Sequence, residues 1–260
     1  MNNLVQKKSK TLIILQARMG SSRLPGKMGK KIINNKSTLE LMIERLKRIK
    51  SEHHLLVATT NLEQDNYLEE ICKKCNITCF RGHPSDVLDR YYHAALSSNS
   101  VDIIVRLTGD CPLHDPDLID YAIHYFKTQS FDYLSNGFPE TFPDGLDVEV
   151  MTFSALKKAY LEAKKPMERE HVTPFIRDNK DLFSCGNFQQ EEDYSHYRWT
   201  LDEAKDLEFI TKIYEALYVK DPNFSTRDII QLLEKKPELL EINKEIPRNE
   251  GYNKKDNKYD

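Results

Sequence analysis

Cationic residues gather in a loop rich in glycine and serine near the start of the chain. The stretch LQARMGSSRLPGK, residues 15–27, places Arg18, Arg23 and Lys27 around two serines and two glycines. Glycine-rich turns let backbone N–H groups approach phosphate oxygens, while arginine adds forked donors and lysine a point charge. The glycine spacing matches neither the Walker A loop nor the dinucleotide fingerprint. The loop is therefore either a polyphosphate-binding turn or a solvated basic surface.

Two aspartates follow strand-like segments further along the chain. Asp110, in RLTGDCP, comes directly after an apolar run, and Gly109 allows close approach there. Magnesium prefers one or two carboxylates together with phosphate oxygens, so Asp110 is either a metal ligand or a turn aspartate. Asp202, in RWTLDEAKDLEFI, ends a short strand-like segment. Its place directly before a helical pattern favours the N-cap of that helix over a metal ligand.

A further group of charged residues occupies two short segments of the second half. FPDGLDVEV, residues 142–150, contains Asp144, Asp147 and Glu149, and the last two would face the same side of a strand. Two carboxylates on one sheet face indicate a cation or a hydroxyl-rich substrate, unless that face meets solvent. EREHVTPFIR adds Glu170 and His171 among other charged side chains. A single histidine is more often structural than catalytic, so His171 gains weight only from these neighbours.

Three cysteines lie close together in CKKCNITC and raise the question of a zinc site. Cys72, Cys75 and Cys79, with His83 as a fourth ligand, form a mixture that zinc sites use. The same residues also fit the end of a helix, a turn at Asn76 and a short strand. No second ligand pair at structural-site spacing follows, which favours small buried cysteines over a metal site.

Apolar strand-like runs alternate with helical patterns through the first half of the chain. Strands are expected at 12–15, 55–60, 77–80 and within 101–112, and helices at 37–50, 65–75 and 85–98. Ser37 and Glu40 are spaced as a capping box at the start of the first helix. The alternation predicts an α/β fold whose mostly parallel sheet carries helices on both faces. Because ligands bind beyond the carboxyl ends of such strands, the polar loops that follow them predict one site.

The second half of the chain is less regular. Further strands are expected at 132–138, 145–153 and 196–202, with helices at 153–163 and 221–236. The last of these helices should be entered through Ser225. No internal repeat and no linker rich in glycine, serine or proline interrupts the sequence. We therefore expect a single domain over residues 11–246, a flexible N-terminus over 1–10 and a polar, disordered tail over 247–260.

Composition limits the classes of partner. The 260 residues carry a formal net charge of −3, with 39% hydrophobic and 30% charged residues. A slightly acidic protein does not capture nucleic acid or anionic membranes through its overall charge. No apolar run approaches the ~20 residues that span a bilayer, and the N-terminus lacks the apolar core of a secretory signal. We expect a cytoplasmic protein with no nucleic-acid or membrane partner.

Six segments together resemble a known family. LIILQARMGSSRLPGK, RGHPSDVLDRYYHAA, RLTGDCPL, DGLDVEV, EREHVTPFIR and RWTLDEAKDLEFI occur in this order. They resemble motifs of the nucleotide-sugar cytidylyltransferases, the acylneuraminate and 3-deoxy-manno-octulosonate group, and most closely its spore-coat polysaccharide branch. The resemblance covers roughly residues 10–245. It implies a three-layer α/β/α nucleotide-diphospho-sugar transferase fold with a Rossmann-like, mostly parallel mixed sheet.

The resemblance also implies roles for individual residues. The CTP triphosphate would be held by Arg18, Ser21, Ser22, Arg23 and Lys27. The wider nucleotide site would add Gln16, Ala17, Gly20, Thr59, Thr60, Asn61, Thr108 and Gly109, with the loop at 59–61 near the base. Asp110 and Asp202 would bind Mg²⁺, in place of the capping role that the local pattern favours for Asp202. The acceptor would face Asp147, Glu149, Glu170 and His171. Arg18, Lys27 and Asp110 would be the catalytic residues.

The implied reaction transfers CMP from CTP to a small acceptor. An anionic oxygen of the acceptor would attack the α-phosphorus in line, and pyrophosphate would leave. The acceptor would be a sugar acid, a phosphate or a phosphonate. Sialic-acid members of the group have a lysine shortly after the serine of the opening motif, where this chain reads SSRLPGK. This difference speaks against sialic acid as the acceptor.

Two other functions fit parts of the pattern. A glycosyltransferase of related fold would consume a nucleotide sugar, but such enzymes usually carry an Asp-x-Asp metal motif where this chain has only Asp110. A non-catalytic nucleotide-binding homologue would lose metal or phosphate ligands, whereas the cationic loop and both aspartates are present. A homodimer is compatible with the exposed strands of the second half.

Overall fold

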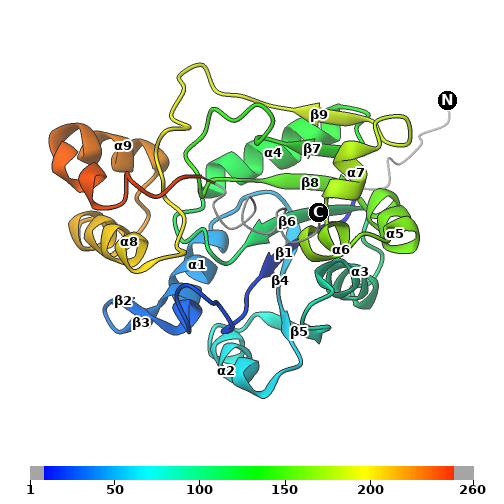
Figure 1. Cartoon of the computed structure of the whole chain (residues 1–260), viewed down its shortest axis with the longest axis horizontal. Helices are drawn as coiled ribbons and strands as arrows, with labels where there is room; N and C mark the ends of the chain where they lie inside the picture. The colour runs from blue at the N-terminus through cyan, green and yellow to red at the C-terminus, as the bar shows by residue number, and fades with distance from the viewer. Residues whose placement is uncertain (1–8, 249–260) are drawn as a thin grey trace, which may run out of the picture.

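The core of the protein is a seven-stranded sheet. The computed structural model describes residues 9–248, so the predictions for the first eight residues and for 249–260 lie outside the described part. Along the sheet the strands follow the order β5-β4-β1-β6-β8-β7-β9 (Figure 1). They span β1 Thr11–Gln16, β4 His53–Thr60, β5 Thr78–Gly82, β6 Ile103–Thr108, β7 Tyr133–Ser135, β8 Glu149–Thr152 and β9 Cys185–Asn187. Only β8 runs antiparallel to its neighbours β6 and β7 within this sheet.

Helices cover both faces of the sheet, as the alternating pattern predicts. Strand β1 shows why, because Ile13 and Leu15 enter one core while Leu12 and Ile14 enter the other. The first core lies under α1 Thr38–Leu46, α2 Asn66–Lys74, α4 Pro116–Thr128, α8 Ala204–Leu217 and α9 Thr226–Lys235. The second lies under α3 Val87–Ser97, α5 Phe153–Glu162, α6 Pro166–His171 and α7 Pro174–Asp178. The three-layer α/β/α architecture is confirmed.

Several predicted boundaries are confirmed in detail. Helix α1 begins after Ser37, whose hydroxyl accepts from the Glu40 N–H while the Glu40 carboxylate accepts from the Ser37 N–H. Ser225 caps α9 in the same way. Cys72 is buried in the first core, as the structural interpretation of the cysteines expects, whereas Cys79, which was expected to be buried too, is only half-buried. Within residues 9–248, no helix is long and apolar enough to cross a membrane.

The predicted strand at 196–202 is wrong. Only an isolated bridge joins Asp144 to Arg198 in this segment. Its backbone N–H groups instead bond two loops, since Trp199 donates to the Asp144 carbonyl and Leu201 to the Asp110 carbonyl, at 2.7 and 2.6 Å. The segment thus crosses the carboxyl edge of the sheet without joining it, and carries Asp202 to a position beside Asp110.

A buried ion pair fixes the end of this crossing segment. The Arg198 guanidinium donates to both oxygens of the Asp206 carboxylate at 2.9 Å. The same carboxylate accepts the N–H groups of Asp202 and Glu203, at 3.0 and 2.9 Å. The N-cap of α8 is therefore Glu203, and the expectation that Asp202 caps this helix is wrong. The Asp202 side chain instead points to the sheet edge, where it pairs with Lys27.

We expect Asp206→Asn to lower the free energy of unfolding by about 3 kcal/mol at pH 7, because it leaves a buried arginine without its carboxylate. Burial opposes ionisation, but hydrogen bonds from Arg198 and Asn243 hold the pKa of Asp206 below its ordinary value of 3.8. Such a group stabilises the fold above pH 3.8, and this contribution is lost as the pH falls through the native pKa.

Urea denaturation at pH 7 and pH 3 measures the effect, with the exposed Asp181→Asn as the matched control. The gap between Asp206→Asn and the wild type should be large at pH 7 and smaller at pH 3. A gap at pH 7 no larger than that of the control would contradict the role of the pair.

Candidate active site

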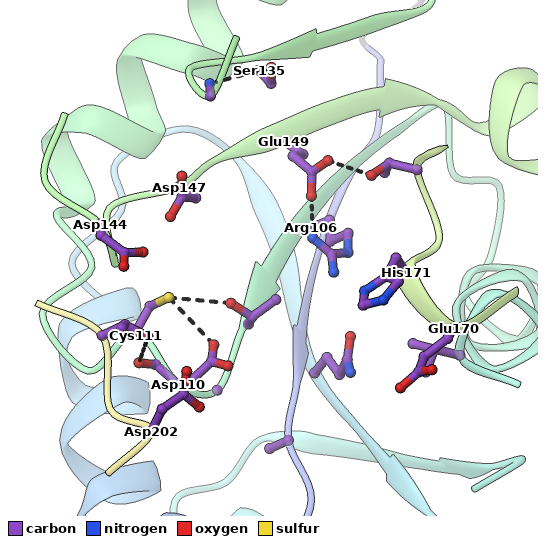
Figure 2. Close-up of a pocket in the computed structure, with 18 of the residues that line it drawn as sticks. Arg106, Asp110, Cys111, Ser135, Asp144, Asp147, Glu149, Glu170, His171 and Asp202 are labelled. Carbon is purple, nitrogen blue, oxygen red and sulfur yellow. Dashed lines mark hydrogen bonds and ion pairs between the residues drawn. The ribbon is translucent and has the colours of Figure 1, made fainter. Parts of the chain in front are cut away.

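A cavity of about 920 Å³ opens at the carboxyl edge of the sheet. The β1 loop, the ends of β6 and β8, helices α6 and α7, and the crossing segment 198–202 all contribute to its wall (Figure 2). It brings together fifteen of the predicted site residues: Gln16, Ala17, Arg18, Ser21, Ser22, Arg23, Lys27, Thr108, Gly109, Asp110, Asp147, Glu149, Glu170, His171 and Asp202. Segments up to 186 residues apart in the chain therefore build one site, as expected from the strand-end loops.

Four predicted nucleotide-site residues do not line this cavity. Gly20 and Asn61 are exposed elsewhere, while Thr59 and Thr60 are buried in the sheet. Thr60 acts behind the loop, because its hydroxyl donates to Asp65, and the Asp65 carboxylate accepts the Met19 N–H at 2.7 Å. The end of β4 thus supports the loop from behind.

The shape of the β1 loop depends on glycine at two positions. Gly26 has φ of 70°, in the left-handed region, and its N–H donates to the Met19 carbonyl at 3.0 Å, which closes the loop. A Cβ atom at Gly109 would lie 2.8 Å from the Gln16 carbonyl oxygen, so the ends of β1 and β6 approach each other only because this side chain is absent. The loop and Asp110 are held close together as a result.

The first half of the cavity is formed by the loop that follows β1, residues 17–27, together with Asp110 and Asp202, and Lys27 contacts both of these aspartates. Its ammonium lies 2.9 Å from an Asp202 oxygen and 3.5 Å from an Asp110 oxygen. It also donates to the Leu201 carbonyl at 2.9 Å. Arg23 reaches the other Asp202 oxygen at 2.9 Å. Two cations and two carboxylates from three distant segments therefore meet at one point.

These contacts shift the ionisation of the central groups. Burial opposes the charged form of Lys27, but the carboxylates of Asp110 and Asp202 raise its pKa. Burial likewise opposes ionisation of Asp110, and Lys27 together with the Thr108 hydroxyl holds the pKa of Asp110 well below its usual range. Lys27 and Asp110 are therefore both charged at neutral pH.

The same two aspartates could hold a magnesium ion. Their carboxylates converge on one cationic group, Lys27, and so lie on either side of one position that a cation already occupies. No group of three or more His, Cys, Asp or Glu side chains able to hold a metal occurs in residues 9–248. Magnesium is commonly bound by one or two carboxylates, with phosphate oxygens and waters completing its shell. Asp110 and Asp202 fit that pattern.

The second half of the cavity lies between strands β6 and β8 and helices α6 and α7, and an ion pair on the sheet forms its floor. Arg106 of β6 lies opposite Glu149 of β8 in the antiparallel register, and the two side chains form a salt bridge. Tyr133 and Thr173 also donate to Glu149, at 2.5 and 2.6 Å. Arg106 is a site residue that the sequence reasoning missed. A single cation inside the apolar run IIVRLT was the available signal.

A strained turn presents His171 and Thr173 to the cavity. Val172 between them has φ of 73° and ψ of −54°. The Thr173 N–H donates to the His171 carbonyl at 2.9 Å, which makes residues 171–173 a γ-turn. Positive φ is an outlier for a β-branched residue, and such strain is concentrated at functional sites. Both flanking residues line the cavity.

Two carboxylates, Asp144 and Asp147, form an acidic corner in the second half of the cavity, on the side away from His171 (Figure 2). Asp147 precedes β8, yet it faces the cavity as Glu149 does, as predicted, because Leu146, Val148 and Val150 enter the first core instead. Figure 2 shows Asp144 and Asp147 to one side of Glu149. Asp144 pairs with Arg198 at 3.3 Å and Asp147 with Arg248 at 2.9 Å. Burial, followed by the neighbouring Asp147, raises the pKa of Asp144 to about 7. Arg248, which was expected in the disordered tail, is thus in contact with the site.

Comparison with known proteins agrees with this geometry. The family model described as cytidylyltransferase matches residues 12–246. The spore coat polysaccharide biosynthesis protein SpsF of Bacillus subtilis is 32% identical over 87% of this chain and 95% of its own length.

Solved structures show the same fold. A cytidylyltransferase from Leptospira borgpetersenii superimposes with a TM-score of 0.85 and 38% identity, over 89% of this chain and 97% of the other. CMP:2-keto-3-deoxy-manno-octonic acid synthetase, solved in complex with CTP, gives a TM-score of 0.62 at 18% identity, over 80% and 99% of the two chains. The second likeness concerns the fold alone.

The matched region spans the sheet, the β1 loop and both aspartates, so that the residues meeting at Lys27 all lie within it. The chain belongs to the cytidylyltransferase family of nucleotidyltransferases.

Proposed function

We propose that the protein transfers CMP from CTP to an anionic small-molecule acceptor, with Mg²⁺ bound and pyrophosphate released. The observation that carries the proposal is the meeting of Lys27 with Asp110 and Asp202 beside a cationic glycine-serine loop. This arrangement supplies both metal-binding carboxylates and phosphate-binding cations within one cavity. The relative that acts in spore coat polysaccharide synthesis supports a role in making a surface polysaccharide precursor.

The β1 loop would bind the triphosphate. Arg18 and Arg23 provide forked donors, and the serines and backbone N–H groups of the loop provide further ones. Lys27 would also bind the triphosphate, as a buried point charge next to Asp110, which lies shortly after β6. The CTP base and ribose would lie near Gln16 and Ala17, at the end of β1.

In the transfer step an acceptor oxygen forms a bond to the α-phosphorus of CTP, and the bond from that phosphorus to the bridging oxygen of the β-phosphate breaks. Pyrophosphate carries away the electron pair. Lys27 and Arg23 would offset the negative charge that grows on the phosphate oxygens. When bound to Asp110 and Asp202, Mg²⁺ would supply further electrostatic stabilisation of these oxygens.

The ionisation of the acceptor decides whether a base is needed. A carboxylate, phosphate or phosphonate is already ionised at neutral pH and attacks without losing a proton. A hydroxyl acceptor requires a general base, and His171 or Asp147 in the second half of the cavity is the candidate.

The five cysteines are free thiols, which suits a reducing compartment, and we place the reaction in the cytoplasm.

We expect Asp110→Asn to weaken the binding of Mn²⁺, used as a paramagnetic substitute for Mg²⁺, at least about tenfold in the presence of CTP, because one of two carboxylate ligands is lost. Pyrophosphate release with a panel of sugar acids and sugar phosphates should fall on the order of 100-fold. Electron paramagnetic resonance measures the first effect without any acceptor. Asp102→Asn, at the other end of β6, is the control, and equal Mn²⁺ affinity in the two variants would exclude Asp110 as a ligand.

Arg23→Ala should weaken CTP binding about tenfold, since a charge-assisted hydrogen bond is worth about 1.5–3 kcal/mol. The effect on CMP should be less than about twofold, because we place Arg23 at the outer phosphates. Calorimetric titration of both nucleotides measures the difference, and the remote Arg48→Ala controls for charge. Equal losses for CTP and CMP would show that Arg23 does not contact the outer phosphates.

A further inference from the structure

The floor of the second half of the cavity presents a single arginine. Arg106 projects from β6 between the sheet and helix α3, where its guanidinium carbon lies 5.9 Å from the centre of the Tyr91 ring. The side chain is 16% exposed, and that exposed part lines the cavity. In Figure 2 it faces His171 and lies away from the acidic corner. A cation held on a sheet floor in this way is fixed in both position and direction.

Glu149 is committed to its protein partners. One carboxylate oxygen accepts from Arg106, while the other accepts from Tyr133 at 2.5 Å and from Thr173 at 2.6 Å. Burial opposes ionisation, but Arg106 and these hydroxyls lower the pKa of Glu149. A ligand hydroxyl would have to displace one of three donors to reach this carboxylate. Glu149 is therefore better suited to positioning Arg106 than to binding the acceptor itself.

The Arg106 guanidinium retains unused donors. Within the described part of the chain it donates only to Glu149, and its buried Nε has no hydrogen-bond partner. The buried Nε is out of reach of a ligand, but Nη2 is not among the fully buried unpaired atoms and makes no hydrogen bond within residues 9–248, so it is the donor that a ligand with acceptor oxygens would meet. Carboxylates and phosphates match the fork of donors on an arginine better than a single hydroxyl does.

The charged side chains of the second half of the cavity are unevenly distributed. Asp144 and Asp147 at the acidic corner present carboxyl oxygens, which accept hydrogen bonds from hydroxyl groups but, when ionised, offer no donor to an anion. His171 lies on the Arg106 side, with Glu170 beside it (Figure 2), and Arg177 lines the same cavity. Hydroxyl groups can instead donate to the oxygens of the acidic corner. A polyhydroxylated molecule with one acidic group would satisfy both sides at once.

We propose that Arg106 is a specificity-determining residue that anchors an anionic group of the acceptor, and that Glu149 positions it. The acceptor is then an acidic sugar or polyol, with a carboxylate or phosphate at Arg106 and hydroxyl groups toward the acidic corner. This inference rests on the proposed function only in naming the bound molecule an acceptor. The anion-binding position itself can be tested with or without CTP.

Three sugars that differ in charge measure whether the protein prefers an anionic sugar to a neutral one. Ligand-observed NMR would give dissociation constants for D-glucose, D-glucuronate and D-glucose 6-phosphate, with CTP and Ca²⁺ present and again without them. The wild type should bind at least one charged sugar about tenfold more tightly than glucose. The two charged probes distinguish a carboxylate from a phosphate. If neither binds more tightly than glucose, the proposal is overturned.

Substitutions test whether Arg106 causes the preference for charged sugars. Arg106→Gln should reduce the preference to less than about twofold, whereas Arg177→Gln, which removes the same charge from the same cavity, should retain more of it. The double variant Arg106→Gln/Glu149→Gln removes both charges together and serves if the single variant fails to fold. Persistence of the wild-type preference in every folded variant lacking Arg106 would overturn the proposal.

The positioning role of Glu149 needs its own comparison. Glu149→Gln should lose most of the charged-sugar preference while its affinity for CTP stays within about twofold of the wild type. Tyr133→Phe removes a donor to Glu149 but keeps the ion pair, so its preference should survive. Equal losses in the two variants would show a merely structural role. Absence of CTP binding combined with an intact preference would overturn the proposed function and leave the anion anchor in place.

Discussion

The meeting of Lys27 with the carboxylates of Asp110 and Asp202 is the interaction on which the rest of the site depends. Each group comes from a different part of the chain, and each is at least partly buried. Burying any one of them alone would be costly. The fold offsets this cost by bringing them together, with the Leu201 N–H bonded to the Asp110 carbonyl and Asp206 holding the start of α8. The architecture around the sheet edge serves to maintain this contact.

The wider cavity distributes charge rather than accumulating it. Six lysines and arginines and six carboxylates line it, so net charge does not select the ligands. Their arrangement does. The β1 loop places cations where a triphosphate would lie, Arg106 places one on the sheet floor, and Asp144 and Asp147 form an acidic corner between these regions and the crossing segment. A nucleotide and an acidic sugar could therefore occupy neighbouring positions, each held by cations of its own.

Sequence reasoning recovers the features that depend on local pattern. The strand–loop–helix alternation predicts the layers, and the strand ends predict that the loop and Asp110 meet. Features that depend on distant pairing escape it. Arg106 and Glu149 are 43 residues apart, and their contact requires the antiparallel register of β6 and β8. Arg248 contacts Asp147 across 101 residues. The capping role predicted for Asp202 is wrong for a local reason, because Asp206 lies three residues after Glu203, at capping-box spacing, and makes Glu203 the N-cap.

The most direct test of the central contact is the melting temperature of the protein with CTP, UTP, GTP and ATP, each with and without Mg²⁺. A ligand at about 100 times its dissociation constant stabilises the folded state by about 2.7 kcal/mol. The account predicts a rise with CTP that is larger than with the other nucleotides and that requires Mg²⁺. A rise with CTP that is the same without the metal, or no rise with any nucleotide, would contradict a magnesium–triphosphate site at Lys27, Asp110 and Asp202.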